Sequence, residues 1–365
     1  MDNLVIKSKN FWEDKNVLLT GHTGFKGTWF LTWLLELGSN VCGYSLDIKN
    51  NTLFKHIDPD KNFQVYGSKY QSIIADLADK STLKSCINNF KPNIIFHFAA
   101  QPLVRESYLD PINTWETNLM GSLNLLESLR YVDYECVVLI ITTDKVYRNT
   151  NRIKPYSEDD ILGGHDPYSA SKACLEIAVD SWRLSFLGEK SHQNPYLSIS
   201  TARAGNVIGG GDWSKDRIIP DIINSIIKNK TLKIRNPSAT RPWQHVLEPL
   251  SGYLLLAEKL FVNKKKFSEA FNFGPDINSN KSVKELTQTI FDIWKSVPVV
   301  IEESNELHES QMLFLDTGKV KKDLKWIPKW NFKTTLEKTV NWYQNFYEGE
   351  DPLWLCKKDL KSYLE

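Results

Sequence analysis

Tyr168 and Lys172 lie four residues apart in a stretch predicted to be helical, and this spacing can carry acid–base chemistry. Residues four apart on a helix project from the same face, so the lysine ammonium can lie beside the phenol. An unperturbed tyrosine has a pKa near ~10, and a shift of about 3 units corresponds to roughly 4 kcal/mol. One cation about 4 Å away, in an effective dielectric of about 20, supplies a similar energy. The pair therefore predicts a phenolate that can act as a base near neutral pH, although a helix can also carry Tyr and Lys by chance.

A glycine-rich turn at residues 20–27 follows the apolar residues 17–19 and precedes a stretch of helical pattern. Its spacing, G-x-x-G-x-x-G, lets the backbone turn tightly and approach a diphosphate closely, and the helix N-terminus adds free N–H groups. The spacing differs from the G-x-G-x-x-G fingerprint of dinucleotide-binding turns, so a plain strand–helix loop is the alternative. The residues expected to hold a cofactor here are Gly21, Thr23, Gly24, Phe25 and Gly27.

Acidic residues after the next two predicted strands also fit a dinucleotide-binding site. Asp47 stands 20 residues beyond Gly27, where a carboxylate would bind a ribose hydroxyl and favour NAD over NADP. An exposed turn residue is an equal alternative for Asp47. Asp76 and Leu77 end the strand predicted over 72–77 and are expected near the adenine side of a dinucleotide.

The elements that must position these residues alternate between strand and helix along the first half of the chain. The first strand, the glycine turn and a helix are predicted together over about 16–38. Further strands are predicted at 41–45, 72–77, 92–100, 136–141, 197–202 and 232–234. Further helices are predicted at 83–87, 112–130, from Tyr168, and at 217–229, 248–262, 282–295 and 334–346. This order predicts right-handed crossovers and a Rossmann-type, doubly wound parallel α/β sheet with helices on both faces. Ligands bind such sheets at the carboxyl ends of the strands. The glycine turn and residues 99–101 and 142–145 should therefore converge on one crevice, with Ala99, Ala100 and Gln101 against a cofactor.

Composition describes an ordinary globular protein of 365 residues, 41% hydrophobic and 24% charged. Lys plus Arg total 45 against 44 acidic residues, so nothing indicates nucleic acid or a membrane as a partner. The five cysteines are scattered, which fits a reducing, cytoplasmic compartment and argues against disulfide or zinc frameworks, so no metal is expected. The length predicts two closely joined lobes: an NAD-binding Rossmann domain over 1–205 and a smaller mixed α/β substrate-binding lobe over 206–365, with some segments returning to the first.

Together, the glycine turn, Asn118, Thr143, Tyr168 and Lys172 form a pattern that resembles the short-chain dehydrogenase/reductase superfamily. The resemblance implies that Thr143, Tyr168 and Lys172 act together on a substrate hydroxyl, that Asn118 supports proton relay, and that NAD is bound. Residues 143–147 resemble the active-site signature of the nucleotide-sugar 4,6-dehydratases in its extended branch. Residues 99–108, 203–213 and 241–246 resemble the CDP-glucose 4,6-dehydratases in particular.

This resemblance implies a dehydration that leaves the cofactor unchanged overall. Tyr168 would take the proton of the sugar C4 hydroxyl while C4 passes hydride to NAD, and the hydride would return to C6 after water is lost across C5 and C6. Asp144 would protonate the leaving C6 hydroxyl, provided that burial raises its pKa. Lys145 stands where dTDP-glucose enzymes have Glu. It is a neutral base, a charge that stabilises the enolate, or a residue that positions Asp144.

The nucleotide-sugar substrate needs charge-assisted donors for its diphosphate, and arginine binds two oxygens at once. Expected substrate contacts are Gln101, Arg105, Tyr108, Asn206, Arg217, Arg235, Arg241 and His245. Salt bridges between the lobes are the alternative for Asn206, Arg217, Arg235 and Arg241. A nucleotide-sugar 4-epimerase, a 4,6-dehydratase for another nucleotide-hexose, and an inactive dinucleotide-binding sensor are the rival functions. The resemblance also implies a homodimer or homotetramer that pairs the helices around 112–130 and 168–186.

Overall fold

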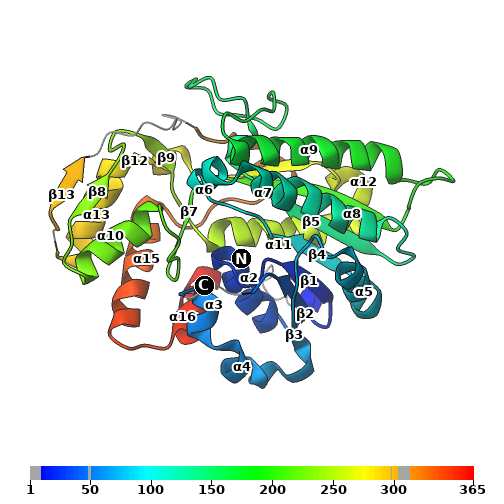
Figure 1. Cartoon of the computed structure of the whole chain (residues 1–365), viewed down its shortest axis with the longest axis horizontal. Helices are drawn as coiled ribbons and strands as arrows, with labels where there is room; N and C mark the ends of the chain where they lie inside the picture. Colours follow the sequence, from blue (N-terminus) through cyan, green and yellow to red (C-terminus); the bar gives the residue numbers. More distant parts are fainter. Residues whose placement is uncertain (1–9, 48–50, 297, 303–312) are drawn as a thin grey trace.

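Seven parallel strands form the central sheet of the computed structural model, which describes residues 10–365 apart from 48–50, 297 and 303–312 (Figure 1). The strand order is β11-β6-β5-β4-β1-β2-β3. Their bounds are β1 Asn16–Thr20, β2 Asn40–Ser45, β3 Tyr70–Ile74, β4 Ile94–His97, β5 Cys136–Ile141, β6 Leu197–Ala204 and β11 Ala270–Phe273. The predicted doubly wound Rossmann-type fold is confirmed.

Alternate residues of the central strands enter two different apolar cores. In β5, Val137, Leu139 and Ile141 join the core on one face, whereas Val138 and Ile140 join the core on the other. Successive side chains of a strand point to opposite faces, and a parallel sheet is covered on both. This explains why β5 appears in the sequence as an uninterrupted apolar run.

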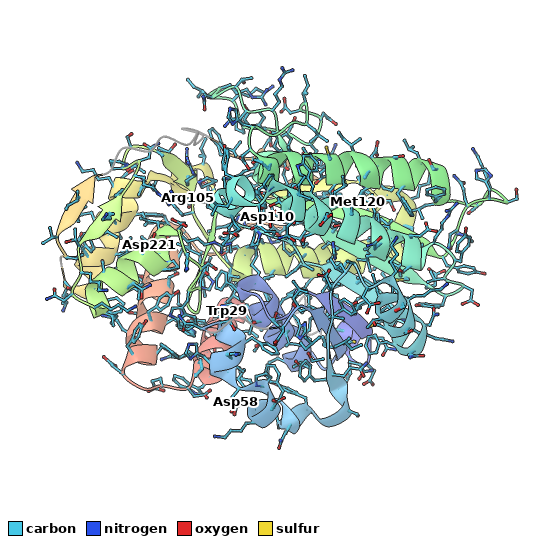
Figure 2. All side chains as sticks on the ribbon, in the orientation of Figure 1. Trp29, Asp58, Arg105, Asp110, Met120 and Asp221 are labelled. Atoms are coloured by element: carbon cyan, nitrogen blue, oxygen red, sulfur yellow. The ribbon has the colours of Figure 1, made fainter. Side chains whose placement is uncertain are left out.

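Helices cover both faces of the sheet. One layer contains α5 (Lys80–Phe90), α6 (Val104–Leu109), α7 (Pro111–Trp115), the π-turn η2 (Glu116–Gly121), α8 (Ser122–Leu129) and α9 (Pro167–Phe186). The other contains α2 (Phe25–Glu36), α11 (Leu247–Val262) and α16 (Pro352–Leu364). Figure 2 places Arg105 and Met120 in the first layer and Trp29 in the second. The predicted helix over 112–130 is thus one continuous path whose middle turn widens to π geometry around Asn118.

The second half of the chain adds short elements around one end of the sheet. Two-stranded pairs join β7 (Val207–Ile208) to β10 (Gln244–His245), β8 (Leu232–Ile234) to β13 (Val300–Glu302), and β9 (Thr240–Pro242) to β12 (Asn280–Ser282). The helices beside them are α10 (Ile218–Ile227), α13 (Val283–Trp294) and α15 (Phe332–Tyr347). Smaller helices are α3 (Leu53–Ile57), α4 (Pro59–Asn62), α12 (Lys264–Phe267) and α14 (Gly318–Asp323).

Three strands of the central sheet differ clearly from the sequence-based expectation. The strand predicted over 72–77 ends at Ile74, so Asp76 and Leu77 lie in the turn that follows it. The strand predicted over 92–100 spans only Ile94–His97. Strand β11 was not predicted, and it pairs with β6, so part of the second half completes the central sheet. Within the described residues, no helix has the length and apolar character needed to cross a membrane.

Candidate active site

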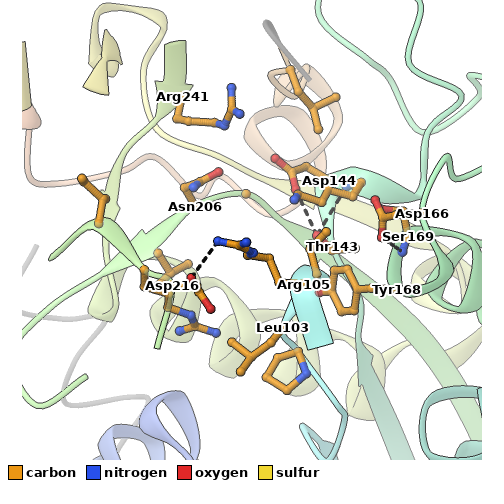
Figure 3. A pocket seen from close by; sticks show the side chains of 18 of the residues that line it. Leu103, Arg105, Thr143, Asp144, Asp166, Tyr168, Ser169, Asn206, Asp216 and Arg241 are labelled. Atoms are coloured by element: carbon orange, nitrogen blue, oxygen red, sulfur yellow. Dashed lines mark hydrogen bonds and ion pairs between the residues drawn. The ribbon is translucent and has the colours of Figure 1, made fainter. Parts of the chain in front are cut away.

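A cavity of about 790 Å³ lies at the carboxyl ends of the central strands, between the sheet and the second half of the chain. This volume is in the range of sites that enclose a small organic ligand. Its walls include Phe25 and Lys26 of the glycine turn, residues 142–145 after β5, and Tyr168 at the start of α9. The opposite wall comes from the second half of the chain (Figure 3). The predicted convergence of strand ends on one crevice is therefore present.

The glycine turn is too crowded for side chains at two of its glycines. Gly21 has a φ of +73°, and a Cβ there would lie 2.7 Å from the Ala99 nitrogen. At Gly27 a Cβ would lie 2.0 Å from the Gly21 carbonyl oxygen. Helix α2 starts at Phe25 with no side-chain cap on its N-terminal N–H groups. Free N–H groups beside a glycine cradle fit the diphosphate of a dinucleotide such as NAD. Thr23, by contrast, shares a 2.8 Å hydrogen bond with Ser45.

Asp144 is buried directly after Thr143, where β5 ends. Its Oδ1 accepts a 3.0 Å hydrogen bond from the Thr143 hydroxyl, and its Oδ2 has no hydrogen-bond partner among the described residues. Burial raises the pKa of Asp144, although Lys145, the Thr143 hydrogen bond, Arg241 and Lys26 all act to lower it. This is the direction required of a group that must carry a proton at neutral pH.

Tyr168 faces Thr143 from the first turn of α9, which the Asp166 side chain caps (Figure 3). Burial raises the pKa of Tyr168 to about 12, while the hydrogen bond with Thr143 and the charge of Arg217 oppose the rise. The lowered pKa expected from the sequence is therefore wrong for this structure, because burial outweighs the Thr143 hydrogen bond and the charge of Arg217. Lys172 donates to the Ile141 carbonyl oxygen at 3.4 Å. Burial, together with the charge of Lys26, lowers the pKa of Lys172 to about 8.

Asn118 and Gln101 form a support beneath the cavity rather than part of its wall. The Asn118 Oδ1 accepts from the Gln101 nitrogen at 2.8 Å, and its Nδ2 donates to the Gln101 carbonyl oxygen and to Ser171 Oγ. The side-chain amide of Gln101 forms hydrogen bonds with the backbone of Leu103 and with the Thr114 hydroxyl. Neither residue lines the cavity, so the structure does not support direct substrate contact by Gln101.

Six of the predicted substrate contacts do line the cavity: Arg105, Tyr108, Asn206, Arg217, Arg235 and Arg241. Arg217 pairs with Asp212 at 2.8 Å. Arg105 and Arg235 both pair with Oδ1 of Asp216, at 3.1 and 3.2 Å. The Arg105 bridge joins α6 to the second half of the chain, whereas the pairs of Arg217 and Arg235 lie within that half. Contact of these arginines with substrate stays a prediction.

His245 lies outside the cavity, contrary to its predicted contact with substrate. Its side chain is fully buried in β10, and its ring packs against Trp29 and Trp330 at centroid distances of 5.7 and 4.8 Å. Burial lowers its pKa to about 3, so the imidazole is neutral. The prediction is corrected because an aromatic environment encloses the ring.

The predicted adenine-side residues also lie away from the cavity wall. Asp76 is exposed and its Oδ1 accepts from the Ala78 nitrogen at 2.8 Å, whereas Leu77 is buried. Asp47 is exposed after β2, beside residues 48–50, which are outside the described residues. Contact between these residues and a cofactor stays a prediction.

Lys26 is a charged cavity residue that the sequence analysis missed. It lies in the first turn of α2 and lines the cavity. Burial and the charge of Arg217 lower its pKa to about 8, while Asp144 opposes the shift. The available signal was a lysine inside the glycine turn, at a helix start where the neighbouring residues are apolar. Within the described part of the chain, no three His, Cys, Asp or Glu side chains gather to hold a metal ion.

Comparisons with known proteins agree with this geometry. A family model described as GDP-mannose 4,6-dehydratase matches residues 18–339. A CDP-glucose 4,6-dehydratase of Salmonella typhimurium is 42% identical, over 98% of this chain and 98% of its own length. A UDP-glucose 4-epimerase of Mycoplasma pneumoniae is 26% identical, over 91% of this chain and 97% of its own. The structure of a Streptomyces venezuelae dTDP-glucose 4,6-dehydratase with NAD and TYD bound has a TM-score of 0.77 at 22% identity, covering 92% of this chain and 99% of its own.

Proposed function

The chain belongs to the GDP-mannose 4,6-dehydratase family, and we propose that it dehydrates CDP-D-glucose to CDP-4-dehydro-6-deoxy-D-glucose with NAD as cofactor. The observation that carries this proposal is the buried Asp144, whose pKa is raised beside Thr143 and Tyr168 in one cavity. A dehydratase needs an acid at this point to protonate the leaving hydroxyl, whereas a 4-epimerase does not. The 42% identical relative supports CDP-glucose as the substrate.

The cofactor would lie along the glycine cradle of residues 21–27 and the uncapped N-terminus of α2. When bound, NAD supplies hydride chemistry, taking hydride from C4 and returning it to C6. The chain's own task at C4 is to remove the hydroxyl proton, and Tyr168 is the group placed to do so. Thr143 holds the phenol by a hydrogen bond, and the charge of Arg217 lowers the cost of the phenolate.

The next step needs an acid at the C6 hydroxyl and stabilisation of the negative charge that develops when C5 loses its proton. Asp144 supplies the acid proton from its buried carboxyl. Lys145 lines the same cavity beside Asp144. We assign Lys145 the role of base: its neutral amine takes the C5 proton, and the ammonium that forms stabilises the enolate, while Asp144 gives its proton to the C6 hydroxyl, which leaves as water. Arg217, Arg235 and Arg241 offer guanidinium groups to the substrate diphosphate.

The proposal also includes how the molecule is organised. Residues 1–205 would bind NAD and 206–365 mainly the nucleotide-sugar, with β11 and α11 returning to the central sheet. A homodimer or homotetramer would form by pairing the helices around 112–130 and 168–186, which are α7, η2, α8 and α9. Its support is the set of exposed apolar side chains there: Ile112, Met120, Ile177 and Leu184. The five free cysteines support a reducing, cytoplasmic compartment.

Turnover of CDP-, dTDP-, UDP- and GDP-glucose by the NAD-loaded protein tests the function. We expect CDP-glucose to give the fastest turnover and a product lighter by the mass of one water. A product of unchanged mass would indicate epimerisation instead. Dehydration with CDP-glucose as the slowest substrate would contradict the assigned nucleotide while retaining the chemistry. If the protein bound NAD but turned over none of the four nucleotide-sugars, the proposal that it is a dehydratase would be contradicted.

A further inference from the structure

A buried carboxylate lies directly behind the cavity, one turn beyond Lys172 in α9. Glu176 shares a helical face with Tyr168 and Lys172, because all three are spaced four apart. Its Oε1 accepts a hydrogen bond from the Thr142 hydroxyl at 2.5 Å. Its Oε2 accepts from Thr201 at 2.7 Å and pairs with Arg203 at 2.9 Å. Glu176 therefore joins α9 to the end of β5 and to the second half of β6.

Arg203, the partner of Glu176, also contacts the far end of residues 142–147, which are called the catalytic segment here. While one of its terminal nitrogens pairs with Glu176, the other donates to the Tyr147 hydroxyl at 2.8 Å. The Tyr147 hydroxyl in turn donates to Asn272 Oδ1 at 2.7 Å. Residues 142–147, which carry Thr143, Asp144 and Lys145, are thus held at their first residue by Glu176 and at their last by Arg203.

The pair is deeply buried but does not line the cavity. The side chains of Glu176 and Arg203 are only 1% and 5% exposed. Burial alone would raise the pKa of Glu176, but Arg203 and the hydroxyls of Thr142 and Thr201 outweigh it and hold the pKa below its ordinary value. An ionised pair in this position is costly to desolvate, and apolar residues of similar size are often at least as stabilising. Its place behind the catalytic segment offers a reason other than stability.

The titratable groups that face Lys172 come from three elements. Lys26 of α2 lowers its pKa, and Glu176 of its own helix raises it. His97 at the end of β4 is buried and neutral, with a pKa lowered to about 3. Glu176 is therefore the group that favours the ammonium form of Lys172 against burial and against Lys26.

We propose that the Glu176–Arg203 pair is a positioning device that fixes Thr143, Asp144 and Lys145 relative to Tyr168 and keeps the Lys172 ammonium charged. Neither residue touches substrate; both act through the residues that do. The inference rests on the function proposed above. Its failure is distinguishable, because the wild-type protein reports on the function and the variants report on the pair.

Glu176→Gln in the NAD-loaded protein is the first test, with Glu248→Gln as a matched control. Glu248 is also a buried carboxylate, accepting from the Lys329 and Trp330 nitrogens and from the Tyr363 hydroxyl, but it lies outside the cavity wall. We expect Glu176→Gln to lower kcat by about 10- to 100-fold with KM nearly unchanged, as for a small misplacement of catalytic groups. The alkaline limb of the pH profile should move to lower pH, by about one unit. Glu248→Gln should lower the Tm and leave kcat and the limb unchanged.

Two further variants complete the test. Lys26→Met removes the opposing cation, so the alkaline limb should move to higher pH. Replacing both members of the pair, Glu176→Leu with Arg203→Met, leaves no buried unpaired charge, so this variant should fold even if Glu176→Gln does not. It should still show the loss of kcat. If either folded Glu176 variant had wild-type kcat and an unmoved alkaline limb, the pair would be only structural and the proposal overturned.

Discussion

Asp144 shows how the position of two oxygen atoms gives an ordinary side chain its chemical role. One carboxyl oxygen accepts a hydrogen bond from Thr143, and the other is buried beside Gly205, where a Cβ would approach it to 2.9 Å. A second donor on that oxygen would favour the carboxylate, and its absence among the described residues leaves burial as the dominant influence on the pKa. The neutral acid is therefore favoured next to the cavity.

Asp144→Asn should remove the acid while preserving the shape of the side chain. We expect NAD binding and the Tm to stay close to those of the wild type, and kcat for dehydration to fall by about 10²–10⁴-fold. Oxidation at C4 does not require this acid, so reduced nicotinamide should accumulate in a single-turnover absorbance measurement. Near-normal dehydration by this variant would exclude Asp144 as the proton donor.

At the residue scale the sequence predicted which side chains gather, but not their protonation. Thr143, Asp144 and Tyr168 line one cavity, as their positions after strand ends and at a helix start indicated. The pKa shifts depend on burial by residues distant in sequence, so the phenolate expected at Tyr168 could not be checked beforehand. His245 stands close in sequence to Arg241, yet only the fold reveals the aromatic rings around it.

At the element scale, the glycine turn positions the start of α2 against the end of β4. Gly21 and Gly27 leave no room for a side chain, whereas a Cβ at Gly24 would have only an ordinary contact of 3.4 Å, with the Gly21 carbonyl oxygen. The three glycines of one motif therefore have different roles. Two allow the turn to close on itself, and the third leaves space around the helix N-terminus.

Gly27→Ala should consequently disrupt the turn, and Gly24→Ala is the matched control. At position 27 the new methyl group meets backbone that cannot rotate away, so the turn must open. We expect a destabilisation of about 2 kcal/mol or more and loss of NAD binding in calorimetry. Gly24→Ala should unfold at a temperature close to that of the wild type. Equal Tm values and equal NAD affinities for Gly27→Ala and the wild type would contradict this account.

The sequence predicted the strand–helix alternation well because buried strands such as β5 are long apolar runs with turn residues at both ends. It did not predict β11, since Ala270–Phe273 is a short stretch that becomes a strand only by pairing with β6. The π-turn around Asn118 was equally hidden, because one widened turn leaves the apolar pattern of 112–130 nearly unchanged. Elements that the sequence did not predict, such as β11, form through contacts with segments that are distant along the chain.

For the whole molecule, three buried histidines tie stability to pH. Burial lowers the pKa of His22 to about 4 and those of His97 and His245 to about 3. His22 lies in the glycine turn, His97 at the end of β4 and His245 in β10, so both halves of the chain contain at least one of them. Each is neutral in the folded protein and gains a proton on unfolding in mild acid.

His245→Phe isolates one of these contributions. The folded pKa of His245 lies below its unfolded value of 6.5, so its stabilisation is present above about pH 6.5 and is lost as the pH falls toward 3. Wild-type unfolding free energy should therefore decline more steeply than that of the variant, by about 1.4 kcal/mol per pH unit between about pH 6 and pH 4. Asp221 and Asp359, whose burial raises their pKa values to about 6, act with the opposite sign but are common to both proteins.

Urea unfolding at a series of pH values measures these slopes, and His192→Gln provides a comparison because that side chain is exposed. We expect His192→Gln to follow the wild-type slope. The Phe ring can keep the contacts with Trp29 and Trp330, so any constant loss of stability in His245→Phe does not affect the comparison of slopes. Parallel lines for the wild type and His245→Phe would mean that His245 titrates alike in the folded and unfolded chains. Burial between the two tryptophans would then not govern its protonation.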